Sequence, residues 1–371
     1  MASIIPSVIF TSVTTGEDER KDDGNHPERI MRAICAIISI GSIVPNVLFL
    51  MAMLCKYSRI RAGHHNILLY NLIISDILAG MAISITPKLI PSETFVNSPR
   101  GLARDIYCRL LWSQFMVFLF GVVSVYTVVF LTAERWVAVH YPFKYRTTMS
   151  STKAKICVLF IWLLGLLSNT PHLTEISPND NDGMEPCHWK YKDYQIRQIV
   201  AFLEITLKFI APSLILVLVL FSLYKKFHHL NPVTCTTRPD REKQLLRMCA
   251  ATSFTVLLCW SPNQVYYLLY KFNVVSIGTT WHRITVALAL STSAINPMIY
   301  CIASTTYRTC LKLFLREIFG KCTSGAHSTQ TFPLAEMRYP NLSRQQTFDT
   351  PFFIRRGNEQ ANGVSTSLQV T

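Results

Sequence analysis

Long apolar stretches separated by short polar segments dominate the chain from about residue 30 to residue 302. In residues 110–133 there is no charged side chain, and Glu134 and Arg135 follow directly. A helix of that length rises roughly 36 Å, which is enough to cross the hydrocarbon core of a bilayer. The pattern predicts seven membrane-spanning helices, at residues 30–55, 66–89, 105–139, 154–173, 198–228, 243–271 and 281–302. They are expected to be helices because backbone that faces lipid must satisfy its own hydrogen bonds.

Composition and charge agree with a membrane protein and orient it. Half of the residues are hydrophobic, 16% are charged, and the mean hydropathy is +0.27, unlike a soluble chain. Lys and Arg outnumber Asp and Glu in alternate loops and in the C-terminal tail, which places these segments inside the cell and the N-terminus outside. The net charge of +14 then describes an inner surface facing anionic membrane lipid, and nucleic-acid binding explains it poorly. We expect a multi-pass protein of the plasma membrane.

The segments outside the spans complete an all-α domain organisation. Residues 1–29 read as an extracellular tail, and residues 30–303 as the seven-helix bundle. Residues 304–320 place apolar and basic side chains on opposite faces, which predicts a short amphipathic helix on the membrane surface. Residues 321–371 have the Ser- and Thr-rich composition of a disordered cytoplasmic tail, in which phosphates would recruit arrestin.

Cysteines lie in three different settings. Most of the 11 fall within spans or on the inner side, where a reduced thiol is expected. Cys108, at the outer start of the third span, and Cys187, in the outer loop 174–197, are the only two on the oxidising side. We therefore expect them to form a disulfide, with two free thiols as the alternative. Cys322, after the surface helix, or Cys310 within it, is a candidate for palmitoylation, with a plain thiol as the alternative.

A carboxylate, Asp76, stands in the middle of the second span. An ionised group there costs roughly 2.5–3.5 kcal/mol on insertion scales, so Asp76 should face the bundle interior and meet polar partners. Candidate partners are Asn46, Ser124, Ser293 and Asn296. Such oxygen atoms would hold a small hard cation, and they would equally form a hydrogen-bonded network without an ion.

Prolines interrupt three of the later spans, at Pro212, Pro262 and Pro297. Proline removes a helical hydrogen bond and kinks the helix. Kinked helices around a buried carboxylate suit a bundle with two conformations better than a rigid anchor.

Several motifs occur in a fixed order along the spans: Asn46, Leu72 with Asp76, Cys108 with Cys187, Glu134-Arg135-Trp136, Trp162, Pro212, Cys259-Trp260-Ser261-Pro262 and Asn296-Pro297-Met298-Ile299-Tyr300. Together they resemble the helix signatures of the rhodopsin-like (class A) G-protein-coupled receptors. The resemblance covers roughly residues 30–320. It implies a receptor that catalyses nucleotide exchange on a heterotrimeric G protein. An enzyme that acts on a small substrate is not expected.

The resemblance also implies roles for residues on the inner side. Arg135 would be the switch arginine, held in the inactive state by Glu134 and by Glu242 at the inner end of the sixth span. Phe143 would contact the G protein, and Tyr300 would turn inward on activation. The activation relay would comprise Trp260, Pro262, Pro212, Asn296 and Pro297. The match at Asp76, Ser124, Ser293 and Asn296 favours a sodium ion over the bare network.

Two departures from the family pattern stand in the third span. Trp136 replaces the tyrosine that usually follows the switch arginine. The interval from Cys108 to Arg135 is about two residues longer than usual. We nevertheless expect one continuous helix from the disulfide to the switch.

The outer half of the bundle indicates the kind of ligand. Val117 stands where amine receptors carry an aspartate, and Leu290 where opsins carry their retinal-binding lysine, so neither ligand is expected. Glu204 and Lys208, four residues apart on one face of the fifth span, should pair with each other or with ligand. By position, the candidate ligand-binding residues are Gln114, Val117, Phe118, Glu204, Lys208, Asn263, Gln264, Tyr267 and His282.

The sixth span also resembles that of neuropeptide receptors, and the outer loop contains Asp180, Asp182 and Glu185. We therefore expect an extracellular peptide ligand with at least one basic group. The alternatives are a small non-amine ligand and, from another class, a transporter or channel in which buried charges mark a permeation path. No catalytic or metal-binding spacing of His, Cys, Asp and Glu occurs in the sequence.

Overall fold

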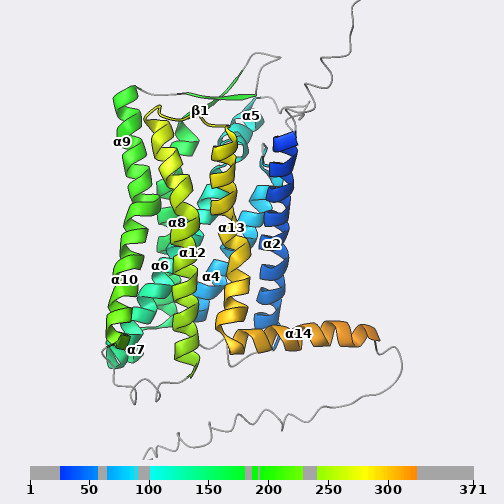
Figure 1. Cartoon of the computed structure of the whole chain (residues 1–371), viewed down its shortest axis with the longest axis vertical. Coiled ribbons are helices and arrows are strands. Elements are labelled where there is room, and N and C mark those ends of the chain that lie inside the picture. Colours follow the sequence, from blue (N-terminus) through cyan, green and yellow to red (C-terminus); the bar gives the residue numbers. More distant parts are fainter. Residues whose placement is uncertain are drawn as a thin grey trace, which may run out of the picture. The chain divides into compact units, whose positions relative to one another are not determined.

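The computed structural model describes residues 26–56, 65–87, 89–90, 101–179, 186–190, 193–228 and 240–323. Within this part of the chain, seven helices are long and apolar enough to cross a membrane, which confirms the predicted spans (Figure 1). The predicted tails at 1–25 and 324–371 and the acidic residues Asp180, Asp182 and Glu185 lie outside the described residues.

The spanning helices largely follow the apolar stretches. In chain order they are α2 (His26–Lys56), α4 (His65–Ile85), α5 (Leu102–Tyr107) with the π-helix η1 (Cys108–Trp112) and α6 (Phe115–His140), α8 (Ser151–Thr174), α9 (Tyr194–Ile205) with the π-helix η2 (Thr206–Ile210) and α10 (Ala211–His228), α12 (Asp240–Lys271), and α13 (Thr280–Ala303).

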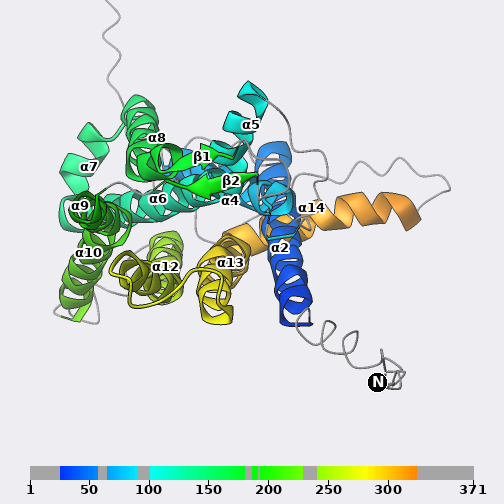
Figure 2. The same ribbon diagram turned by 90° about the horizontal axis from the view of Figure 1, so that it is seen from above.

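Helix α6 is the centre of the packing, in contact with α4, α8, α10, α12 and α13. In the most apolar part of this helix 78% of the residues are buried, a larger share than in any of the other six spans. The hydrophobic core here includes Val122 of α6, Trp260 of α12 and Tyr300 of α13. Figure 2 shows the other spanning helices arranged around it. Substitutions in α6 therefore affect most of the bundle.

The third span is not the continuous helix that we expected from the sequence. A π-helical turn occupies Cys108–Trp112, and Gln114 follows with a left-handed backbone at φ 62°. The Cβ atom makes that conformation unfavourable for any residue other than glycine, so packing on both sides must hold it. The π turn and the left-handed residue account for the longer interval between Cys108 and Arg135. From Phe115 to His140 the helix is continuous.

A small β-hairpin, which the sequence did not predict, covers the outer end of the bundle (Figures 1 and 2). Strand β1 (Ile176–Pro178) pairs antiparallel with β2 (Cys187–Trp189). The predicted disulfide is confirmed: Cys187 is bonded to Cys108, with the two Cα atoms 5.6 Å apart. The outer loop is therefore fixed to η1.

The predicted surface helix is present as α14 (Thr305–Thr323), and it runs from the inner end of α13 past α2 and beyond it, roughly at right angles to the spans (Figure 1). Cys310 and Phe314 pack against Ala52 of α2, while Arg308 and Lys312 are exposed. The Cys310 thiol is buried and donates to the carbonyl of Ala52 at 3.4 Å, so it is a poor acylation site. The side chain of Cys322 lies outside the described residues.

Candidate functional site

A cavity opens beneath the hairpin at the outer end of the bundle. Among the candidate ligand-binding residues, Gln114, Phe118, Lys208, Asn263, Gln264, Tyr267 and His282 line it. Its other lining residues are Trp112, Ser113, His172, Trp189 and Ile277, which the sequence did not single out. Aromatic rings and uncharged polar groups therefore form most of the wall.

Two of the candidate ligand-binding residues lie elsewhere. Val117 is fully buried in an apolar cluster with Ala82 and Leu290, because its side of α6 faces the second and seventh spans. Glu204 does not line the cavity; it lies behind Lys208 and is only 2% exposed. Sequence position correctly identified the spans that form the cavity. It did not identify which side chains of those spans point into the cavity.

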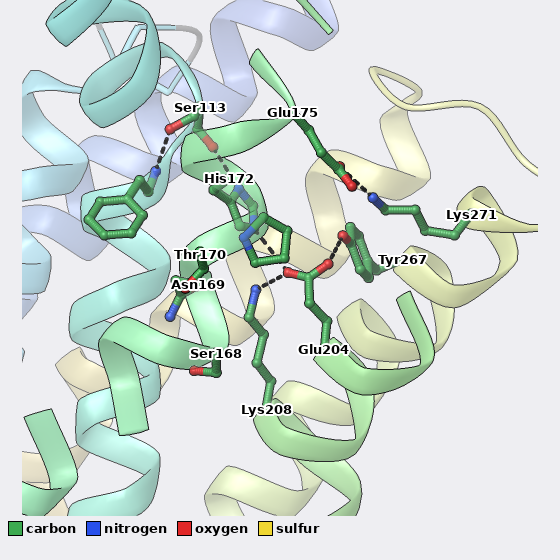
Figure 3. Close-up of polar contacts among 12 residues, drawn as sticks. Ser113, Ser168, Asn169, Thr170, His172, Glu175, Glu204, Lys208, Tyr267 and Lys271 are labelled. Carbon is green, nitrogen blue, oxygen red and sulfur yellow. Dashed lines mark hydrogen bonds and ion pairs between the residues drawn. The ribbon is translucent and has the colours of Figure 1, made fainter. Parts of the chain in front are cut away.

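The Glu204 carboxylate has three polar neighbours, one on each of η2, α8 and α12 (Figure 3). Lys208 Nζ lies 2.6 Å from Oε1, and His172 Nε2 lies 3.8 Å from the same oxygen. The hydroxyl of Tyr267 donates to Oε2. A carboxylate with both oxygens engaged inside the bundle has little capacity for a further cation. This arrangement favours the internal ion pair over direct contact between Glu204 and a basic ligand group.

His172 joins this network to the cavity wall. Its Nδ1 lies 3.1 Å from the carbonyl oxygen of Ser113, and its ring stacks on Phe118 with the centroids 5.5 Å apart. Ser113 precedes the left-handed Gln114, so His172 helps to hold the break in the third span. Nothing in the sequence indicated these contacts, because His172 is an isolated histidine that follows a proline.

A second buried ion pair lies further out. Lys271 Nζ is 2.8 Å from Glu175 Oε2, and the two side chains are 2% and 7% exposed. The same ammonium lies over the ring of Tyr267, 5.2 Å from its centroid. Arg197 of α9 donates to the carbonyl of Lys271 at 2.8 Å. Together these contacts fix the outer end of α12 to α9 and to Glu175, the residue before the hairpin; Figure 3 shows the Glu175–Lys271 pair.

The predicted polar cluster around Asp76 is present in the middle of the bundle. Ser124 Oγ and Asn296 Nδ2 each donate to the Asp76 carboxylate at 2.8 Å, and the Ser293 side chain lies close by. Asn46 donates to the carbonyl of Ser293 at 3.0 Å. The Oδ1 atom of Asn296 is buried without a partner in the described part of the chain. This set of oxygen atoms fits a small hard cation.

The candidate relay residues lie between the cavity and the inner side. Trp260 Nε1 is 3.4 Å from Thr292 Oγ1, and its ring lies so close to Gly121 that a Cβ there would be 2.9 Å from ring carbons. Pro262 and Pro297 lie inside α12 and α13. Pro212 stands two residues after the end of η2, so the fifth span departs from α-helical geometry just before its proline. The buried hydroxyl of Tyr300 has no partner among the described residues.

At the inner end of α6, Arg135 pairs with Glu134 at 2.9 Å. The hydroxyl of Tyr145, from the short helix α7 (Pro142–Thr148), accepts a hydrogen bond from Arg135 and donates one to Glu134, both at 2.7 Å. Glu242, although described, forms no ion pair with Arg135 and is exposed in the first turn of α12. The predicted Arg135–Glu242 contact is therefore not formed, and Tyr145 supplies the second partner.

Uncharged groups hold the inner end of α12 instead. The buried side chain of Gln244 accepts from Ser304 Oγ at 3.1 Å and from the backbone N–H of Thr306 at 3.5 Å. Further along α12, Ser253 shares a hydrogen bond of 3.0 Å with Thr132 of α6.

Trp136, which follows Arg135, connects α6 to α10. Its indole N–H donates to Ser222 Oγ at 2.9 Å, and its ring stacks on His140 with the centroids 4.8 Å apart. Nearby, Phe143 is 86% exposed at the start of α7, as a contact residue for a partner requires.

Seven spans, a disulfide-linked outer hairpin and a buried arginine at the inner end of the central helix define an integral membrane protein of receptor architecture. Residues 46–300 match the family model described as 7 transmembrane receptor (rhodopsin family). The chain therefore belongs to the rhodopsin-like (class A) family of G-protein-coupled receptors.

Three relatives illustrate the similarity. Somatostatin receptor type 4 of Rattus norvegicus is 26% identical, over 82% of this chain and 79% of the relative. Neuropeptide receptor 22 of Caenorhabditis elegans is 24% identical, over 80% and 73%. Galanin receptor 2a of Danio rerio is 22% identical, over 78% of each chain.

Proposed function

We propose that this receptor is activated by an extracellular peptide and catalyses nucleotide exchange on a heterotrimeric G protein at the plasma membrane, with its N-terminus outside. The likeness to receptors named for somatostatin, galanin and neuropeptides supports a peptide ligand. The aromatic and polar wall of the outer cavity supports it as well.

One observation carries the proposal: a single continuous helix connects the two sides. Helix α6 bears Phe118 in the outer cavity and Arg135 at its inner end. Ser124, bound to Asp76, lies between them, 11 residues or roughly 16 Å from Arg135. Displacement of the outer part of α6 by a ligand would therefore reach the inner end.

On the inner side, activation would release Arg135 from Tyr145 and separate Gln244 from the corner between α13 and α14. The exposed Phe143 would then contact the G protein beside Arg135, and the Tyr300 hydroxyl would find a partner when it turns inward. Each of these changes breaks only a few hydrogen bonds, as an equilibrium between two states requires.

Two further components are part of the proposal. Sodium would be held by Asp76, Ser124, Ser293 and Asn296, where it would supply a positive charge that stabilises the inactive packing. The phosphorylated tail would recruit arrestin, and the basic face of α14 would lie on membrane lipid.

The experiment is nucleotide exchange by purified receptor in lipid nanodiscs. The receptor should accelerate GTP loading of at least one heterotrimer when a stimulating peptide from a synthetic library is present. The Arg135→Ala variant should lose this activity while keeping its thermal stability within a few degrees, and the exposed Arg308→Ala variant serves as the matched control. Solute flux through the protein without any exchange activity would refute the proposal.

A further inference from the structure

The wall of the outer cavity is electrically balanced. Among the described residues that line it, Lys208 carries the only full charge when the histidines are neutral. That charge is already compensated by Glu204, 2.6 Å away and behind the wall. A charged ligand group would enter this poorly hydrated space without an opposite charge, which is costly. The wall therefore favours a ligand group with no net charge.

Gln264 adds a second and independent feature. Its side chain lines the cavity, is only 3% exposed, and has a buried Oε1 atom with no hydrogen-bond partner among the residues described. Its Nε2 atom makes only a long contact of 3.4 Å, to Oδ1 of Asn263. Buried acceptors without a donor are destabilising, so a ligand N–H placed here would gain a full hydrogen bond.

Lys208 supplies the complementary donor. An ammonium group has three N–H donors, and in this structure one of them is used by Glu204 (Figure 3). The cavity thus presents a free acceptor and remaining donors in a wall without net charge. Ammonium and guanidinium groups have donors but no acceptor, whereas a carboxylate has acceptors but no donor. A neutral amide is the common chemical group with both.

We infer that the ligand group bound in this cavity is a neutral carboxamide, which donates to Gln264 and accepts from Lys208. The inference rests on the proposed function, since it takes this cavity as the ligand site. It replaces the expectation of a basic ligand group. The amide is either a primary carboxamide, at a chain end or on a side chain, or a secondary amide of the peptide backbone.

Binding of small probes tests the inference without any G protein. The probes are N-acetylphenylalanine carboxamide, the free acid, and the amine in which an aminomethyl group replaces the carboxamide; the phenyl ring suits the cavity wall of Phe118, Trp112 and Trp189. Ligands of this size bind with a Kd on the order of 1 mM, within the range of saturation-transfer NMR. The N-methylamide distinguishes the two sources: equal binding indicates a backbone amide, and weaker binding a primary carboxamide.

The full-length receptor in nanodiscs should bind the carboxamide at least tenfold more tightly than the acid or the amine. Gln264→Leu should abolish this preference, and Gln195→Leu, at an exposed glutamine of α9, should retain it. Gln264→Glu should reverse it in favour of the amine, which provides a gain of binding that misfolding cannot imitate. Tighter binding of the acid or amine to the wild type, equal binding of all three, or no binding of the carboxamide would overturn the inference. Failure of nucleotide exchange would leave these binding results unchanged.

Discussion

Tyr145 offers the sharpest test of how Arg135 is held. Its hydroxyl lies between the Arg135 guanidinium and the Glu134 carboxylate, at 2.7 Å from each. Burial raises the pKa of the Tyr145 hydroxyl above its ordinary value, so the group stays protonated and donates to Glu134 while it accepts from Arg135. Tyr145→Phe removes both bonds and keeps the ring, whose centroid is 5.6 Å from the guanidinium carbon.

The expected magnitude follows from these contacts. A hydrogen bond to a charged group contributes about 1.5–3 kcal/mol, and two such bonds are lost. The direct Arg135–Glu134 pair at 2.9 Å remains and offsets part of the loss. A net change of about 2 kcal/mol would raise the population with Arg135 released by roughly 30-fold.

The assay is agonist-free nucleotide exchange by receptor in nanodiscs with a responsive heterotrimer. Tyr145→Phe should raise the basal rate by at least tenfold. Tyr141→Phe is the matched control, because Tyr141 is exposed on the same connection and its ring contacts Trp136 rather than Arg135. A basal rate unchanged by Tyr145→Phe, in a receptor that still responds to agonist, would refute the reasoning.

Three further predictions follow from buried contacts. Glu175→Gln and Lys271→Met should each lower the free energy of unfolding by about 3 kcal/mol, and the double variant should recover part of the loss. The measurement is heat-induced labelling of buried cysteines. Gln244→Ala should raise basal nucleotide exchange about 30-fold, at about 1 kcal/mol for each of two hydrogen bonds, whereas Glu242→Gln should leave it unchanged. Burial raises the pKa of Cys310 to about 11, so alkylation measured by mass spectrometry should be slow at pH 8 and accelerate up to about pH 11.

Each of these predictions has a distinct contrary result. Additive losses in the double variant would show that Glu175 and Lys271 do not act as a pair. A basal rate raised by Glu242→Gln but not by Gln244→Ala would show that an ion pair between Glu242 and Arg135, and not Gln244, restrains basal activity. Rapid labelling of Cys310 at pH 8 in the folded receptor would show that its thiol is accessible.

The spans, the disulfide and the Asp76 cluster could be predicted from the sequence, because each depends on residue type and spacing within regular helices. The left-handed backbone at Gln114 could not be predicted, since glutamine has no preference for this conformation and tertiary packing imposes it. Whether Glu242 reaches Arg135 could not be read from the sequence, because an acid at the expected position does not fix the direction of its side chain. Tyr145 and Gln244 were missed because their partners come from elements whose relative placement is set only by the folded bundle.

The left-handed backbone at Gln114 divides the third span into two bodies. The outer one, η1, carries the disulfide to the hairpin, whereas the inner one begins at Phe115 and carries Arg135. A hinge at this point would let the hairpin tilt without turning α6 about its axis. Ligand entry and a displacement of Arg135 would then be separate motions, and a ligand would have to contact side chains beyond Phe115 to produce the second.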